Sequence, residues 1–241
     1  MTADVAVVGG GPAGSAAATA LARRGRRVVL LERTRFETTR VGETVGGEIA
    51  PLLQALGIET ASLATSHVPF RAVRSAWGTA DLVERSAITH PLGEGLHVER
   101  SRFDERLAQN AASAGARVQT GAGRCLVERD SDGDGFVVTP AHGQPVRARI
   151  VIDASGRGAP ATAALRPRKS WLSCDRLVGL VGVVGVADST SNVGTGSPSS
   201  SRALDPELLI ETCEHGWWYS APQPNGQLVV TLMTDADLTP A

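Results

Sequence analysis

Two patterns of hydrophobic and polar positions alternate near the start of the chain. Residues 5–8 form an apolar run with β-branched side chains, which is typical of a parallel strand buried on both faces. Glycines follow at once, and residues 16–22 form a small-residue, helix-favouring run that ends near Gly25. A second strand is predicted over residues 26–32. This order of strand, glycine turn, helix and strand predicts a βαβ unit and an α/β fold.

Two further helices are predicted downstream. A polar, glycine-bearing loop leads into an apolar-periodic helix from about residue 48 to 56. A later helix has Asp104 near its start, Leu107 and Ala111 on one face, and Gly115 as its stop. These helices supply the layers that a buried parallel sheet requires.

The acidic stretch "RDSDGDGF" at 129–136 resembles the opening of a calcium loop. The closing glutamate of such a loop is absent, because Ala141 stands at its position, and no helix pattern flanks the stretch. Since "CLVE" and "FVVT" flank it, we expect a hairpin turn instead.

A second glycine series, Gly179, Gly182 and Gly185, has the spacing GxxGxxG and no alanine-rich helix after it. We expect a buried strand of a second domain there, and no second nucleotide site. Residues 189–201 are rich in glycine and serine and predict a mobile loop or insertion. The expected domains are residues 1–165 and 166–241.

Composition and charge exclude several classes of protein. The formal net charge is −1, which disfavours a nucleic-acid binder. No basic leader or apolar membrane span is visible. No cysteine pair has the CxxC spacing and no histidines have metal-ligand spacing, so we expect no metal, no disulfides and a soluble, cytoplasmic protein. The residues concerned are Cys125, Cys174, Cys213, His67, His90, His97, His142 and His215.

The first glycine turn carries the clearest chemistry. Gly9, Gly11 and Gly14 match G-x-G-x-x-G, in which glycines allow a tight turn, a close approach to a pyrophosphate, and helix–strand packing. The phosphates are expected on the helix N-terminus. Glu32, 18 residues beyond Gly14, is placed to accept hydrogen bonds from the adenosine ribose. The motif alone leaves FAD and NAD open, and an NAD-dependent dehydrogenase is one alternative.

Four blocks in order suggest a family. They are the opening βαβ unit, R-x-G-E at 40–43, V-x-R-x-x-F-D at 98–104, and "VIDASGRGA" at 151–159. Together they resemble flavin-dependent monooxygenases of the para-hydroxybenzoate hydroxylase fold. The strongest likeness is to the branch with flavin-dependent halogenases, geranylgeranyl-reductase-like proteins and tryptophylquinone-maturing flavoproteins. The resemblance implies a discontinuous Rossmann-like FAD domain of the glutathione reductase type with a β-rich substrate domain.

That resemblance also implies a set of FAD-binding residues. Ser155 stands where hydroxylases of this fold carry an acid, which removes any carboxylate role at that position. Glu43 is left undecided between a flavin-side acid and a helix-proximal carboxylate. The cofactor-binding candidates are Gly9, Gly11, Pro12, Ala13, Gly14, Glu32, Arg33, Arg40, Arg100, Asp153 and Gly156.

The segment "GWWYSAPQPNG" at 216–226 suggests the substrate side. Halogenases of this branch carry W-x-W-x-I-P beside the flavin; Trp217 and Pro222 match it, whereas Tyr219 and Ala221 do not. Trp217 and Tyr219 are the candidate pocket residues. Those halogenases also use a lysine before V-x-R-x-x-F-D, but the single lysine here is Lys169.

Halogenation is therefore less favoured than oxygen transfer. The resemblance implies that a flavin C4a-hydroperoxide delivers oxygen to an aromatic or other electron-rich substrate. Such a substrate is a small molecule or is carrier-bound, and electrons come from NAD(P)H or a flavin reductase. The sequence assigns no catalytic acid or base.

Family members also carry a G-D motif after the substrate-domain sheet, and none follows Gly216 here. We therefore expect the C-terminal part of the fold to be missing. A truncated or degenerate flavoprotein with weak or no FAD binding is a further alternative.

Overall fold

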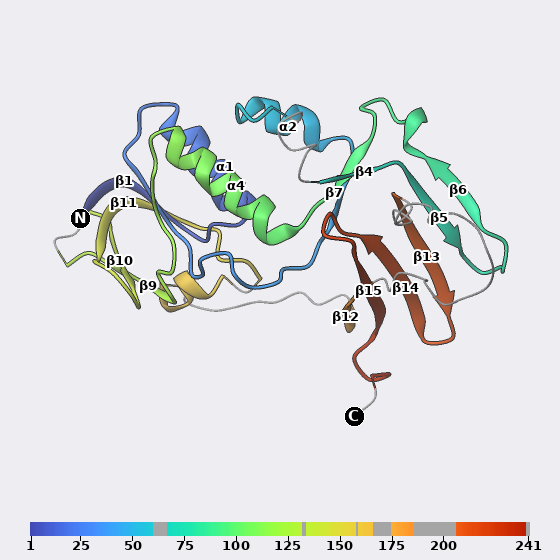
Figure 1. The fold of residues 1–241 in the computed structure, drawn as a ribbon. Coiled ribbons are helices and arrows are strands. Elements are labelled where there is room, and N and C mark those ends of the chain that lie inside the picture. Colours follow the sequence, from blue (N-terminus) through green and yellow to red (C-terminus); the bar gives the residue numbers. More distant parts are fainter. Residues whose placement is uncertain (60–66, 132–133, 158, 166–174, 186–205, 240–241) are drawn as a thin grey trace. The chain divides into compact units, whose positions relative to one another are not determined.

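The computed structural model describes residues 1–59, 67–131, 134–157, 159–165, 175–185 and 206–239 (Figure 1). Close packing of the backbone divides the chain into two units. Unit 1 comprises residues 1–40 and 100–171, and unit 2 comprises residues 41–99 and 172–241. The domain boundary expected after residue 165 places 41–99 in the first domain, whereas the packing groups that segment with the second. Both units are therefore assembled from discontinuous pieces of chain.

Unit 1 is built on a six-stranded sheet with the order β8-β2-β1-β11-β10-β9. β1 lies in its middle, parallel to both β2 and β11. β8 continues the parallel part beyond β2, whereas β10 and β9 add an antiparallel edge. The strands are β1 Thr2–Val8, β2 Val28–Leu31, β8 Arg117–Gln119, β9 Cys125–Arg129, β10 Phe136–Pro140 and β11 Val146–Asp153.

Two helices, α1 (Pro12–Ala22) and α4 (Arg100–Ser113), lie side by side over one face of this sheet (Figure 1). Their small residues let them pack closely on the strands: Ala18, Ala108 and Ala111 share one core with the apolar side chains of β1 and β2. A second core on the other side joins β1 and β11 to the β9–β10 hairpin and to the short 3₁₀ helix η2 (Pro160–Leu165). The first strands are thus buried on both faces, as predicted for residues 5–8.

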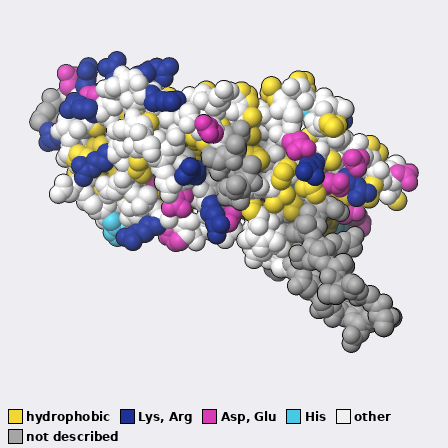
Figure 2. All heavy atoms as spheres, turned by 45° about the horizontal axis from the view of Figure 1, so that its top comes forward, with side chains coloured by type: hydrophobic (Ala, Val, Ile, Leu, Met, Phe, Trp, Pro, Cys, Tyr) yellow, Lys and Arg dark blue, Asp and Glu magenta, His cyan; other side chains and the backbone are white. Residues whose placement is uncertain are grey.

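The helices and strands predicted from the sequence for unit 1 are present in the structure, although some of their bounds differ. The first predicted helix begins earlier than its alanine run, at Pro12, and the second strand is shorter at both ends than residues 26–32. The acidic stretch joins β9 to β10 in an antiparallel hairpin, with the Asp130 N–H donating to the Gly135 carbonyl at 3.0 Å. Exposed arginines follow the end of α1, and Figure 2 shows basic side chains gathered over this unit.

Unit 2 contains two sheets and the helix α2 (Ile49–Ala55), which falls within the predicted range 48–56. The larger sheet has the order β12-β15-β14-β13-β5-β6 and the smaller one β3-β7-β4. A 3₁₀ turn, η1 (Ala87–Thr89), follows β6. The strands are β3 Thr44–Val45, β4 Val68–Phe70, β5 Ala72–Ala76, β6 Val83–Ser86, β7 Gly95–His97, β12 Leu177–Gly185, β13 Glu207–Cys213, β14 Gly216–Pro222 and β15 Gln227–Asp235.

The glycine series at 179–185 forms a strand, β12, but the expected burial is wrong. Leu180, Val181, Val183 and Val184 are each 40–47% exposed. β12 is the end strand of its sheet and pairs there with β15. A continuous apolar run is buried on both faces only where other elements cover both faces of the sheet, and the exposed side chains of β12 show that this cover is incomplete.

The glycine- and serine-rich segment 189–201 and Lys169 lie outside the described residues. Within the part of the chain that is described, no helix combines the length and the apolar character needed to cross a membrane.

Candidate cofactor site

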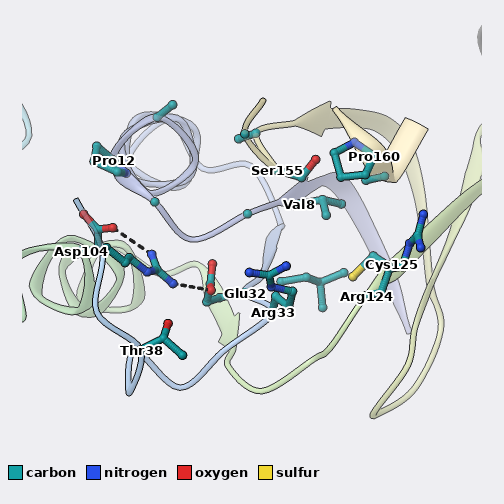
Figure 3. A pocket seen from close by; sticks show the side chains of 18 of the residues that line it. Val8, Pro12, Glu32, Arg33, Thr38, Asp104, Arg124, Cys125, Ser155 and Pro160 are labelled. Atoms are coloured by element: carbon teal, nitrogen blue, oxygen red, sulfur yellow. Dashed lines mark hydrogen bonds and ion pairs between the residues drawn. The ribbon is translucent and has the colours of Figure 1, made fainter. Parts of the chain in front are cut away.

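A cavity of about 810 Å³ lies in unit 1 at the carboxyl ends of the central strands (Figure 3). In open α/β sheets this edge is where ligands bind, between the strand ends and the helix N-termini. The cavity volume is that of a small-molecule site. Its lining residues are Val8, Gly9, Gly11, Pro12, Ala13, Leu31, Glu32, Arg33, Thr38, Thr39, Arg40, Arg100, Asp104, Gly123, Arg124, Cys125, Ala154, Ser155, Gly156, Pro160 and Ala161.

The three motif glycines have different steric roles. Gly9 has φ +109°, and a Cβ added there would lie 2.2 Å from the Ala154 carbonyl oxygen at the end of β11. A Cβ at Gly14 would lie 1.8 Å from the Gly9 carbonyl oxygen. A Cβ at Gly11, in contrast, would meet no heavy atom within 4 Å. Gly9 and Gly14 therefore close the turn, whereas Gly11 leaves space in the cavity wall.

The N-terminus of α1 is suited to an anion. Gly11 is the N-cap, no side chain caps it, and the first turn holds no acidic residue. Pro12 at the first helical position supplies a preset φ and has no N–H to satisfy. The first N–H groups of a helix have no intrahelical partner, and the helix dipole adds partial positive charge. A phosphate at Gly11 would therefore find free donors.

Glu32 is buried at the end of β2 and is fixed by several donors. Its Oε2 accepts the Gly10 N–H at 2.6 Å, and its Oε1 accepts the N–H and hydroxyl of Thr34 at 3.0 and 2.8 Å. Burial opposes ionisation, but the bonds from Thr34 and Gly10 and the nearby Arg40 lower the pKa of Glu32. The carboxylate thus remains charged at the place where a ribose hydroxyl would donate.

Arg40 connects this carboxylate to α4. Its guanidinium donates to Glu32 Oε1 at 2.7 Å and to Asp104 Oδ2 at 2.8 Å, and Figure 3 draws a dashed line at each of these two labelled carboxylates. It also lies over the ring of Phe36, 5.0 Å from the centroid. Although burial opposes its charge, the bond to Asp104 and the Glu32 carboxylate raise the pKa of Arg40. The R-x-G-E arginine therefore lies beside Glu32 in the cavity wall.

Asp104 is fully buried and binds a second arginine. Arg100, one helical turn earlier in α4, donates to it from Nε and Nη2 at 3.2 Å each. Sequence reasoning placed Asp104 in the V-x-R-x-x-F-D block but assigned it no role. Its position in that block was the available signal, and the structure shows that it orients both motif arginines.

Asp153 and Gly14, two of the predicted cofactor residues, do not line the cavity. The Asp153 carboxylate accepts the N–H and hydroxyl of Ser155 and those of Thr162. Burial raises and these hydrogen bonds lower the pKa of Asp153, with a net lowering. It thereby holds the turn at residues 154–156, which does line the cavity and includes the predicted Gly156. The predicted Gly9, Gly11, Pro12, Ala13, Glu32, Arg33, Arg40 and Arg100 all line it.

Several cavity residues had no recognisable sequence pattern. Gly123, Arg124 and Cys125 reach the cavity from the start of β9. Burial raises the pKa of the Cys125 thiol to about 11, with a smaller contribution from Glu32, so that it is a neutral wall group. These residues are far from the glycine motif in sequence, and only the β9–β10 strands bring them to this edge.

The predicted substrate residues lie on β14 in unit 2. The Tyr219 hydroxyl donates to Glu43 Oε2 at 3.1 Å, and the Trp217 ring lies 5.9 Å from that of Trp77. Glu43, left undecided from sequence, is buried. His97, on β7 of the same unit, is also buried, and burial lowers its pKa to about 4. Among the described residues, no three His, Cys, Asp or Glu side chains group as metal ligands.

The residues of the cavity fit the adenosine diphosphate part of a dinucleotide. The space at Gly11, the uncapped helix N-terminus and the buried Glu32 lie on its wall together. This arrangement defines a dinucleotide-binding protein of the Rossmann-like class.

The chain belongs to the FAD dependent oxidoreductase family, whose model matches residues 4–167. It is 31% identical over 239 residues to a putative FAD-dependent oxidoreductase, LodB, of Marinomonas mediterranea, covering 98% of this chain and 61% of the relative. It is also 31% identical over 179 residues to the 1H-pyrrole-2-carbonyl-[peptidyl-carrier protein] chlorinase of Pseudomonas fluorescens, covering 64% of this chain and 39% of that relative. FAD is therefore its cofactor.

A solved structure shows the same fold. The flavin-dependent halogenase CmlS superposes with a TM-score of 0.78 and 27% identity, covering 98% of this chain and 42% of that one. The mixed α/β architecture expected from sequence is confirmed. The chain spans about 40–60% of the length of the proteins named here.

Proposed function

We propose that this FAD-dependent oxidoreductase is a monooxygenase that transfers oxygen to an aromatic or other electron-rich substrate. The observation that carries the cofactor part is the open wall at Gly11, set between an uncapped helix N-terminus and the buried Glu32. The departures from W-x-W-x-I-P at Tyr219 and Ala221, together with the absence of a lysine before residue 169, support oxygen transfer over halogenation.

In this proposal the chain binds and orients FAD through residues of unit 1. The helix N-terminus at Gly11 holds the pyrophosphate, and Glu32 accepts the ribose hydroxyls. Arg40 and Arg100 are kept in place by Asp104 and balance its charge at the cavity wall. Bound FAD, when reduced, supplies the oxygen-activating chemistry, and the protein excludes water from it. Trp217 and Tyr219 contribute to the substrate side.

Halogenation is the second candidate. It is supported by the similarity to a chlorinase and to the flavin-dependent halogenase CmlS. Either reaction uses an electron-rich substrate, so that the product, rather than the cofactor, distinguishes them.

The partners follow from the same comparison. We propose a small-molecule or carrier-bound substrate, because the chlorinase relative is named for a carrier-bound pyrrole. We also propose NAD(P)H or a flavin reductase as the source of electrons, and a cytoplasmic location.

The test supplies the protein with FAD, NADH and a flavin reductase, and offers indole, pyrrole and phenol with and without chloride and bromide. A product carrying isotope from labelled dioxygen, formed without halide, is the expected result. A halogenated product that needs halide would replace the first candidate by the second. Absence of any product that depends on both FAD and the protein would overturn both candidates. The variant Gly11→Ala serves as the binding-deficient control.

A further inference from the structure

One buried carboxylate oxygen in unit 2 has no hydrogen-bond partner in the part of the chain that the structure describes. Glu43 is 2% exposed, and its Oε1 has no hydrogen-bond partner among the described residues. Its other oxygen, Oε2, accepts the Tyr219 hydroxyl at 3.1 Å. The side chain is therefore half satisfied, at a position that water reaches poorly.

The backbone holds Glu43 in this position. The Val98 N–H donates to the Glu43 carbonyl at 2.6 Å, and the next residue, Thr44, pairs with His97 in the β3–β7 ladder. Val98 itself is fully buried. These bonds fix the backbone at Glu43, and the bond from the Tyr219 hydroxyl holds the carboxylate in its buried position.

Burying a polar oxygen without a partner is unfavourable, and native proteins nearly always satisfy such atoms with protein, ordered water or ligand. An unsatisfied carboxylate oxygen in a rigid setting is accordingly an acceptor directed at something outside the chain. Because a carboxylate accepts and does not donate, the group that completes it must be a donor, N–H or O–H.

The strand that carries Tyr219 also supplies aromatic surface. Side chains two apart on a strand point to the same face, so Trp217 accompanies Tyr219 on β14. Trp217 contacts Trp77, with ring centroids 5.9 Å apart at an interplanar angle of 57°. Opposite Tyr219 on β15 lies Thr231, which is buried. Trp217 therefore offers an aromatic surface to a planar ligand on the face of β14 that also carries Tyr219, whose hydroxyl binds Glu43.

We propose that Glu43, held by Tyr219, is the anchor for the ring N–H or phenolic O–H of the substrate, which selects aromatic hydrogen-bond donors such as indoles, pyrroles and phenols. This inference rests on the proposed function, since it assigns the substrate side to unit 2.

The state of Tyr219 fits this role. Burial is the largest cause that raises the pKa of the Tyr219 phenol; Thr231 lowers it and the Glu43 carboxylate raises it, with a net increase that keeps the phenol protonated at neutral pH. It therefore donates to Oε2 and leaves Oε1 for the substrate. A hydrogen bond to the substrate donor orients the ring and increases its electron density, which favours attack on an electrophilic oxygen or halogen.

Binding of indole and N-methylindole tests the anchor without any flavin chemistry, because the two probes differ only at the ring nitrogen, where a methyl group replaces the donor hydrogen; comparison with E43Q separates the loss of the donor from the added bulk. We expect indole to bind the full chain with saturation, and N-methylindole about 10-fold more weakly, as one hydrogen bond to a charged acceptor provides. Protein-observed NMR titration or quenching of tryptophan fluorescence gives both dissociation constants.

Three variants complete the design. E43Q is expected to reduce the indole preference to within about 2-fold, and Y219F to weaken indole several-fold by releasing the carboxylate. E211Q, the same substitution at an exposed position on β13, is the matched control and retains the wild-type preference. FAD titration and circular dichroism of each variant show that unit 1 and the fold are intact.

Equal affinity for the two probes, no saturable indole binding, or an unchanged preference in E43Q would each overturn the anchor. These outcomes are separate from failure of the proposed function, which is read from FAD-dependent product formation. If the protein forms product but binds indole and N-methylindole equally well, the proposed function stands and the role of Glu43 as the anchor is refuted.

Discussion

The substitution Gly11→Ala separates cofactor binding from folding. Gly11 has φ −72°, an ordinary value for alanine, and an added Cβ meets nothing within 4 Å. Alanine is a poorer N-cap than glycine by up to about 1 kcal/mol, and the stiffer unfolded chain offsets about 0.4–1 kcal/mol of this. We therefore expect the free energy of unfolding to change by less than about 1 kcal/mol.

The same methyl group projects into the space at the helix N-terminus. If it displaces one charge-assisted hydrogen bond to the pyrophosphate, FAD binding loses about 1.5–3 kcal/mol, or about 10- to 100-fold in affinity. Titration of the apoprotein with FAD, followed by flavin and tryptophan fluorescence, measures this loss, and thermal unfolding measures stability.

Two further variants control for position. Gly185→Ala also adds a Cβ with no heavy atom within 4 Å, but on β12 of unit 2, and is expected to leave FAD affinity unchanged. Gly14→Ala would place a Cβ 1.8 Å from the Gly9 carbonyl oxygen and should lower stability by about 1–3 kcal/mol or more. Unchanged FAD affinity in Gly11→Ala would refute the placement of the pyrophosphate at this turn.

Three other predictions concern buried ionisable groups. Glu32→Gln should lower the free energy of unfolding by about 1–3 kcal/mol near neutral pH. Because the folded pKa of Glu32 is lowered, the wild type loses this stabilisation as pH falls below about 4.5. Urea unfolding at several pH values should therefore show a smaller loss of stability in acid for the variant than for the wild type. The pKa of His97 is about 4, against 6.5 ordinarily, so the free energy of unfolding should fall by up to about 3 kcal/mol as pH falls from 6.5 to 4. His97→Gln should remove this pH dependence, and an identical pH dependence in the variant would contradict the assignment. Cys125, buried with a pKa of about 11, should react with iodoacetamide at mildly alkaline pH at least about 10-fold more slowly than the exposed Cys213, as peptide mapping would show; equal rates would exclude the buried thiol.

Local sequence patterns were sufficient for the elements around the glycine turn. β1, α1 and β2 follow from an apolar β-branched run, a glycine motif and an alanine-rich stretch, each of which has a conformational preference of its own. The position of Glu32 at the end of β2 follows from the same order. The burial of β12 could not be predicted in this way, because an apolar run does not show whether neighbours cover a strand.

The contacts of the candidate site depended on residues far apart in the chain. Arg40 and Asp104 are 64 residues apart and form one ion pair, and Glu43 and Tyr219 are 176 residues apart and share a hydrogen bond. A sequence motif identifies such residues one block at a time. It does not show which side chains meet, since that depends on how strands from separate segments align.

The family resemblance implied FAD, and the sequence by itself determined the dinucleotide-binding turn and the order of the main elements. Those properties rest on interactions between residues close along the chain, which local periodicity records. Only the tertiary structure decided that Asp104 orients two arginines, that Asp153 supports a turn from outside the cavity, and that one oxygen of Glu43 has no partner among the described residues. Each of these depends on burial and on long-range pairing, which are properties of the packed chain and not of any segment.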